Sequence, residues 1–193
     1  MIWIYIIAVI VIIIDQATKL IVMHTMDLED SIRVIKDFFY ITYIKNDGVA
    51  FGYNFSENPV INLVIQFLIA AVCLTLFVFL STKIKSFKGN KWYSISLGLL
   101  IGGLIGNVID RIFYDTHSVT DFLSFILYYP WFQDGKLVIM SYPFAVFNFA
   151  DSCLNVGVFM MVIYLIFMEP KRAKAIHEEE SEKEDEVIDL GKK

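Results

Sequence analysis

Four long apolar stretches constrain this chain more than any other feature of its sequence. They cover residues 2–22, 59–80, 92–110 and 144–168. Each is long enough to cross a hydrocarbon core of about 30 Å, which takes roughly 20 helical residues. The apolar runs are continuous rather than alternating, and lipid leaves no backbone group unbonded, so helices are favoured over strands. The sequence predicts an all-α membrane protein, a bundle of four transmembrane helices.

Composition agrees with this prediction. Hydrophobic residues make up 57% of the chain, and the mean hydropathy is +0.61. Soluble domains rarely contain so much apolar material. The two cysteines lie in apolar runs and the three histidines are scattered, which argues against a zinc site. We expect no metal and no cofactor, and nothing in the charge pattern suggests nucleic-acid binding.

Basic residues indicate how the chain is oriented in the membrane. Segment 81–91 carries four lysines and no acidic residue, and another basic cluster follows the last apolar stretch at 171–174. Both clusters are expected in the cytoplasm by the positive-inside rule. With four spans, both termini are then cytoplasmic, and segments 23–58 and 111–143 face outward.

The segments outside the spans differ in character. Residues 33–45 are rich in β-branched and aromatic side chains and precede the turn signal Asn46-Asp47-Gly48, which predicts a strand in a small sheet on the outer membrane surface. Segment 111–143 is aromatic with few charges, as in an interfacial loop or amphipathic helix. We divide the chain into a membrane domain, 1–168, and a charged cytoplasmic tail, 169–193, expected to be disordered.

Several polar residues lie within the apolar stretches, where a charge costs roughly 2.5–3.5 kcal/mol on insertion scales. Helical spacing groups them by face, and helix length places them at a similar depth in the outer leaflet. Such a set can bond helices together structurally, or it can form a functional site. The groups are Asp15 with Lys19, then Asn107, Asp110 and Arg111, then Asn148, Asp151 and Asn155.

Carboxylates are the best candidates for chemistry in this chain. No histidine is placed to activate Cys153, and no HExxH metalloprotease motif is present. Two aspartates held close together in a low-dielectric site share one proton, so one activates water while the other polarises a peptide carbonyl. Asp110, Asp121 and Asp151 are the candidates near the outer surface, and the residues alone leave open which two pair.

Five ordered motifs between Asp15 and Gly157 resemble the lipoprotein signal peptidase (signal peptidase II) family. Each motif alone is weakly specific, but their order on four correctly oriented spans is strongly specific. They are Asp15-Gln-x-x-Lys19, Asn46-Asp-Gly-Val-Ala-Phe51, Gly102-Gly-Leu-Ile-Gly-Asn-Val-Ile-Asp-Arg111, Val119-Thr-Asp-Phe122 and Phe147-Asn-Phe-Ala-Asp151.

The resemblance implies an aspartyl endopeptidase of the bacterial cytoplasmic membrane, acting near its outer face. Its substrate would be a prolipoprotein with a diacylglyceryl-modified cysteine, cleaved just before that cysteine. By resemblance, Asp121 and Asp151 are the catalytic pair. The positions that match substrate-binding residues are Asn46, Gly48, Asn107, Arg111 and Asn148, and those that match supporting residues are Asp15, Lys19 and Asp110.

The chain departs from the family pattern in places. Val49 stands where alanine is common and Thr120 where valine is common, while segment 122–147 is longer than usual and contains an Asp134-Gly135 turn signal. These changes bear on loop conformation and substrate preference. Two other functions remain open: a small ion or solute transporter that uses the buried Asp/Asn/Arg cluster, and a catalytically silent scaffold that binds lipoproteins.

Overall fold

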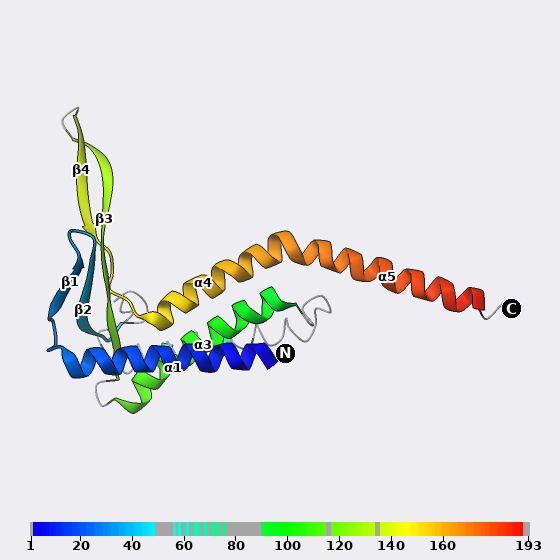
Figure 1. Cartoon of the computed structure of the whole chain (residues 1–193), viewed down its shortest axis with the longest axis horizontal. Helices are drawn as coiled ribbons and strands as arrows, with labels where there is room; N and C mark the ends of the chain where they lie inside the picture. Colours follow the sequence, from blue (N-terminus) through cyan, green and yellow to red (C-terminus); the bar gives the residue numbers. More distant parts are fainter. Residues whose placement is uncertain are drawn as a thin grey trace.

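A computed structural model of the 193-residue chain describes residues 2–48, 90–114, 117–133 and 136–190, together with residues 56, 58, 61, 64, 65, 68, 71, 72 and 75. The expected span at 59–80 therefore lies largely outside the described residues. In chain order the elements are α1 (Ile2–Thr25), β1 (Ser31–Ile35), β2 (Phe39–Asn46), α3 (Lys91–Phe113), β3 (Val119–Gln133), β4 (Lys136–Pro143), α4 (Phe149–Ile163), the π-helical turn η2 (Tyr164–Met168) and α5 (Glu169–Leu190) (Figure 1).

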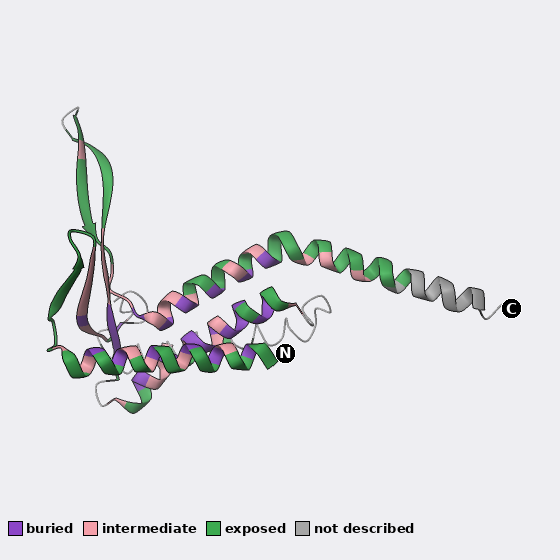
Figure 2. Cartoon of the chain, viewed as in Figure 1, coloured by how far each residue is buried: buried purple, intermediate pink, exposed green. Residues whose placement is uncertain are grey.

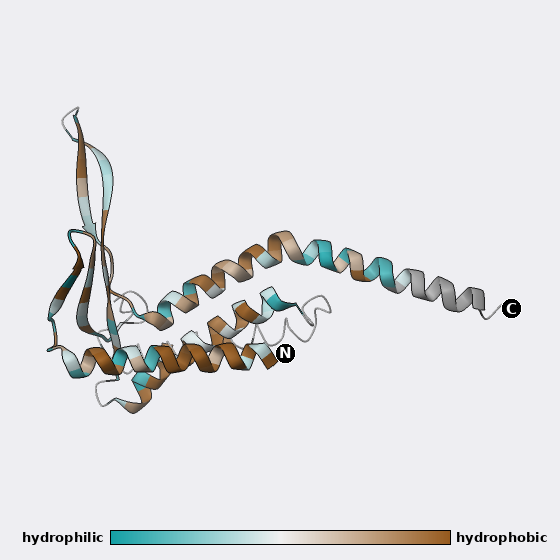
Figure 3. Cartoon of the chain, in the orientation of Figure 1, coloured by the Kyte–Doolittle hydropathy of each residue, from teal (hydrophilic) through white to brown (hydrophobic). Residues whose placement is uncertain are grey.

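Three described helices are long and apolar enough to cross a membrane: Ile2–Thr25, Lys91–Phe113 and Phe149–Glu179. They match three of the four expected spans. The last one begins at Phe149, later than the expected residue 144, because Phe147 still pairs with Leu123 of the sheet and Asn148 caps the helix. Much of their outer surface is exposed and hydrophobic, as lipid contact requires (Figures 2 and 3).

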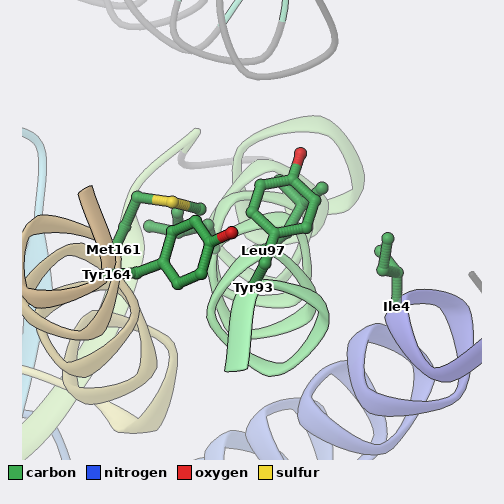
Figure 4. Close-up of a cluster of buried hydrophobic side chains, with 6 residues drawn as sticks. Ile4, Tyr93, Leu97, Met161 and Tyr164 are labelled. Atoms are coloured by element: carbon green, nitrogen blue, oxygen red, sulfur yellow. The ribbon is translucent and has the colours of Figure 1, made fainter. Parts of the chain in front are cut away.

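Helix α3 packs between α1 and α4, and its glycines allow the close approach. A Cβ at Gly102 would lie 2.7 Å from the Cβ of Val11 on α1, and one at Gly103 would lie 2.6 Å from the carbonyl oxygen of Ala150 on α4. Small residues at such spacing let transmembrane helices touch through their backbones. Away from the sheet, the three helices share a cluster of buried side chains that includes Ile4, Tyr93, Leu97, Met161 and Tyr164 (Figure 4).

The four strands form one antiparallel sheet in the order β1-β2-β3-β4. This confirms the expected small sheet, although 33–45 forms parts of two strands rather than one, with Asp37 at φ 57° between them. The sheet packs against the C-terminal end of α1, where Val22 contacts Tyr43 of β2 and Phe122 of β3.

Segment 111–143 contains a β-hairpin where a loop or an amphipathic helix was expected, so the expected secondary structure of this segment was wrong. Strands β3 and β4 pair from Ile126↔Pro143 to Gln133↔Lys136. Aromatic and β-branched residues favour strands when a neighbouring strand is present to pair with them. The Asp134-Gly135 turn signal lies outside the described residues, between two paired ends.

The tail was also expected to be disordered, and the structure instead has helix α5 from Glu169 to Leu190. The sequence there is rich in Glu and Lys, which have high helix propensity. Lys174 and Glu178 form an i,i+4 pair at 3.6 Å, a spacing that supports an exposed helix. The helix also continues directly from η2, so no new helix nucleus is needed.

Candidate active site

Asp121 lies at the third position of β3, opposite Ile44 of β2, and its side chain is fully buried. Its two carboxylate oxygens each accept a hydrogen bond from a different asparagine. Asn46 Nδ2 donates to Oδ2 at 2.8 Å, and Asn148 Nδ2 donates to Oδ1 at 2.7 Å. The strand register therefore places this carboxylate between the sheet and the start of α4.

Burial raises the pKa of Asp121, because it penalises the charged form, and the negative charge of Asp151 raises it further. The two asparagine hydrogen bonds oppose these effects, since they favour the carboxylate. The result is a pKa of about 7. Near neutral pH this carboxyl can therefore hold or release a proton, as a general acid requires.

Asp151 occupies the third position of α4 and takes part in its N-terminal cap. Asn148 Oδ1 accepts from the Asp151 backbone N–H at 2.9 Å, while Asp151 Oδ2 accepts from the Asn148 backbone N–H at 3.2 Å. This reciprocal capping box fixes the side chain in the first helical turn, where the helix dipole favours negative charge. The other oxygen, Oδ1, accepts from Asn107 Nδ2 at 2.8 Å.

Asn107 and Asn148 connect the two aspartates. Asn148 Nδ2 donates both to Asp121 and to Asn107 Oδ1, the latter at 3.0 Å. Asn107 Oδ1 also accepts from Lys19 Nζ at 3.0 Å. Because the Asn107 oxygen has two donors, its amide nitrogen must point toward Asp151. Both asparagine side chains therefore have a fixed orientation.

A buried ion cluster supports this arrangement. Lys19 Nζ lies 2.8 Å from Asp15 Oδ2 and 3.2 Å from Asp110 Oδ2, and all three side chains are fully buried. Each carboxylate also accepts a backbone N–H beside a candidate catalytic residue. Asp15 Oδ1 accepts from Ala150 at 2.9 Å, and Asp110 Oδ2 accepts from Thr120 at 2.9 Å. The cluster therefore holds the backbone immediately before each of the two aspartates.

Arg111 and Gly48 meet beside the pair. Arg111 Nη2 donates to the Gly48 carbonyl oxygen at 3.0 Å, and the Gly48 N–H donates to Asn46 Oδ1 at 2.8 Å. The guanidinium thus fixes the chain just after β2, and through it the asparagine that contacts Asp121. Both Asp121 and Asp151 lie near enough to interact electrostatically with Arg111.

All ten residues proposed from the sequence gather at the end of the helices that carries the sheet. Asn155, on the same helical stripe, is exposed, and its Nδ2 donates to the backbone carbonyl oxygen of Asp151 rather than to a carboxylate. Sequence reasoning missed Gln16, whose Nε2 donates to Asp15, to Asp110 and to the Gly106 carbonyl. Its place in the Asp15-Gln-x-x-Lys19 motif was the available signal.

Lys45 and Thr120 were also missed. Lys45 Nζ donates to Thr120 Oγ1 at 2.9 Å and lies 5.0 Å from the ring centroid of Tyr114. Partial burial lowers the pKa of Lys45, and the charge of Asp110 opposes that effect. The Thr120 hydroxyl thus gives this lysine a partner beside Asp121.

Comparisons with known proteins identify the family of this chain. The family model described as signal peptidase (SPase) II, Peptidase_A8, matches residues 7–167. A lipoprotein signal peptidase of Listeria monocytogenes serotype 4a is 34% identical over 172 residues, which is 89% of this chain and 97% of the relative. That of Halothermothrix orenii is 33% identical over 162 residues, 84% of this chain and 94% of the relative.

Solved structures show the same fold. A bacterial membrane enzyme determined by the in meso method at 2.3 Å is 34% identical and has a TM-score of 0.65, covering 84% of this chain and 87% of the other. A second, at 1.9 Å, is 33% identical with a TM-score of 0.64, covering 86% and 93%. With a family model and relatives that match nearly the whole membrane region, the chain belongs to the signal peptidase II family of membrane aspartic peptidases.

Proposed function

We propose that Asp121 and Asp151 are the catalytic pair of this aspartic peptidase. We further propose that it removes signal peptides from diacylglyceryl-modified prolipoproteins by cutting before the lipidated cysteine. The observation that carries the proposal is the placement of Asn148, which bonds both aspartates, Asp121 through its side chain and Asp151 through its backbone. The relatives are lipoprotein signal peptidases, which supports the substrate class.

The two carboxyl groups have different surroundings, which suggests different roles. Asp121, with a pKa of about 7, holds the shared proton and polarises the scissile carbonyl. Asp151, capped at the start of α4, takes a proton from water, which attacks that carbonyl. As the tetrahedral intermediate collapses, the C–N bond breaks and the amine leaves with a proton returned from the pair. No covalent enzyme intermediate forms.

We assign substrate contacts to the polar groups that surround the pair. Amide and guanidinium groups are suited to holding an extended peptide backbone, because they donate to carbonyls and, in amides, also accept from N–H groups. The exposed apolar surfaces of the spanning helices suit the acyl chains of the substrate. The proposed contacts are Asn46, Gly48, Asn107, Arg111 and Asn148.

The proposed location is the bacterial cytoplasmic membrane, with four spans, both termini in the cytoplasm and the site near the outer face. The N-terminus, the start of α3 at Lys91 and the end of η2 lie at one end of the helices, and the sheet lies at the other (Figure 1). The basic residues that follow η2 are on the first of these sides. The remaining expected span, 59–80, lies largely outside the described residues.

The experiment is cleavage of a synthetic lipidated prolipoprotein by purified enzyme in detergent or liposomes. Asp121→Asn and Asp151→Asn are each expected to lower the rate at least about 100-fold, because each loses one acid–base group. Asp37→Asn is the matched control, since this aspartate is exposed and its pair with Lys36 is 4.0 Å long. A rate near wild type in either variant at the pair would disprove the assignment.

A further inference from the structure

The outer part of the β3–β4 hairpin extends beyond the rest of the sheet. Pairing between β2 and β3 ends at Phe39↔Phe125, and from Ile126 to Gln133 strand β3 pairs only with β4 among the described strands. At about 3.3 Å per residue this extension is roughly 25 Å long. Figure 1 shows it running sideways from the end of α1, across the direction of the helix rather than along it.

The surface of this extension is apolar and exposed. Trp131 is 56% exposed, Phe132 74% and Ile139 66%. Lys136 is the one charged side chain among the described residues from Ile126 to Pro143. Exposing so large an apolar surface to water is unfavourable, and soluble monomeric proteins rarely have such a surface unless it binds a partner. Figure 2 shows most of the hairpin exposed.

Both faces of the hairpin are apolar, and this identifies the kind of partner. Cross-strand pairs share a face, so Tyr129 with Met140 and Trp131 with Val138 lie on one side. Phe132 with Leu137 lies on the other. A protein docked on one face would leave the other exposed. A lipid phase can instead surround both faces, and tyrosine and tryptophan are the residues enriched at membrane interfaces.

Among the described strands, the outer edges of β3 beyond Phe125 and of β4 have no partner, which limits how deep the hairpin can lie in the membrane. An open sheet edge carries unbonded N–H and C=O groups, which are not tolerated in the hydrocarbon core. The headgroup region still contains water for these groups. The root of the hairpin is also fixed at the level of the helix ends, because Phe122 packs with Val22 of α1.

We propose that the paired strands Ile126–Gln133 and Lys136–Pro143 of the β3–β4 hairpin are a second membrane anchor, which lies in the headgroup region of the bilayer beside the spanning helices. It belongs to the same strand as Asp121, so lipid binding at the hairpin holds the strand that presents this residue. The proposal rests on the position of the hairpin in a membrane protein and does not depend on the peptidase chemistry.

The test uses Trp131 as the probe. The chain is prepared with Trp3→Phe and Trp92→Phe, so that Trp131 is the single tryptophan, and is reconstituted in phosphatidylcholine–phosphatidylglycerol liposomes without other proteins. We expect quenching by lipids brominated near the headgroup end of the acyl chain and protection from aqueous iodide. This arm leaves the hairpin unaltered. If iodide quenches the fluorescence of Trp131 as strongly as that of a soluble indole, the proposal is wrong.

A charged variant provides the second arm. Phe132→Glu with Ile139→Glu is expected to reduce bromolipid quenching several-fold and to open Trp131 to iodide, because glutamate resists burial at the interface. The matched control is Ile32→Glu with Val34→Glu on β1, at the opposite edge of the sheet and 55% and 54% exposed in the wild-type chain, which should leave Trp131 quenching unchanged. Protection from iodide that disappears on dilution of the protein in lipid would indicate a second copy as the partner and would also overturn the proposal.

Discussion

At the scale of single residues, the candidate site is organised by two asparagines and one lysine. Lys19 donates to the side-chain oxygen of Asn107, so the Asn107 amide nitrogen points toward Asp151. Asn148 contacts both Asp121 and Asp151. Asparagine supplies a donor and an acceptor on one short side chain, so it can orient two carboxylates without adding charge.

The pH dependence of cleavage follows from Asp121. Its pKa is raised by burial and by Asp151, so the protonated form persists up to about pH 7 and is lost above it. We therefore expect kcat/KM to fall as pH rises through about 7. Asn46→Ala removes a hydrogen bond that lowers this pKa, so the falling limb should move to higher pH. The measurement is a pH–rate profile, and Ser31→Ala, in the exposed strand β1, is the control.

If the falling limb of the pH–rate profile lies at the same pH in Asn46→Ala as in the wild type, a group other than Asp121 controls it. The direction of any movement is as informative as its size. A shift toward lower pH contradicts the assigned hydrogen bond, because removing a donor to a carboxylate can only favour its protonated form.

Lys19 is the second residue whose replacement has a clear expected result. Lys19→Met leaves Asp15 and Asp110 buried without their shared cation. Breaking a buried ion pair typically costs about 3–5 kcal/mol. The free energy of unfolding in detergent should fall by about this amount, and cleavage should fall with it. Lys36→Met is the control, because its pair with Asp37 is exposed, and an equal loss in both variants would contradict the role of the cluster.

At the scale of elements, α3 lies between α1 and α4 among the described helices, and its glycines face both of these neighbours. Gly102 faces α1, and Gly103 faces the start of α4, which carries Asp151. The contacts between helices thus determine the distance between the elements that hold the ion cluster and those that hold the aspartates. Strand β3 has a comparable position, since it carries Asp121 at one end and the membrane-facing hairpin at the other.

Gly102→Ala tests the helix contact. A Cβ there would meet the Val11 Cβ at 2.7 Å and the Ala8 carbonyl oxygen at 2.9 Å, and the backbone oxygen has little freedom to move. Alanine is about 1 kcal/mol better than glycine in a helix, yet we expect a lower thermal midpoint in detergent. Ile105→Ala is the control on the exposed side of α3, and a Gly102 variant as stable as the wild type would disprove the close contact.

At the scale of the whole molecule, the site lies where the sheet meets the ends of the spanning helices. This position suits a substrate held by its own lipid, because the scissile bond and the anchor are then presented at the same level. Helix α5 extends in the other direction, away from the sheet (Figure 1).

Truncation after residue 175 is therefore expected to leave cleavage within about twofold of the full chain, since terminal segments outside the packed structure tolerate removal. The truncated chain retains the basic cluster at 171–174, which keeps the orientation signal. The measurement is the same lipopeptide assay, with the full chain alongside. A large loss of activity would show that α5 contributes to the reaction.

The sequence by itself determined the membrane class, three spans that the structure describes and the family, which the comparisons confirm. It did so because hydropathy is a local property and because the ordered motifs survive in the chain. The proposed roles of Asp121 and Asp151 remain predictions, although the structure brings these residues together. A helical face or a motif indicates that a residue is a candidate for the site, but it does not show which residue contacts it.

The tertiary structure alone decided the rest. It set the later start of α4, because Phe147 pairs with Leu123 of β3 before the helix can begin. It turned segment 119–143 into a hairpin, since strand formation depends on a neighbouring strand that the local sequence does not specify. It also showed that Asp15 and Asp110 bind the backbone beside each catalytic candidate. These contacts join positions far apart in the chain, so they exist only once the helices and the sheet have packed.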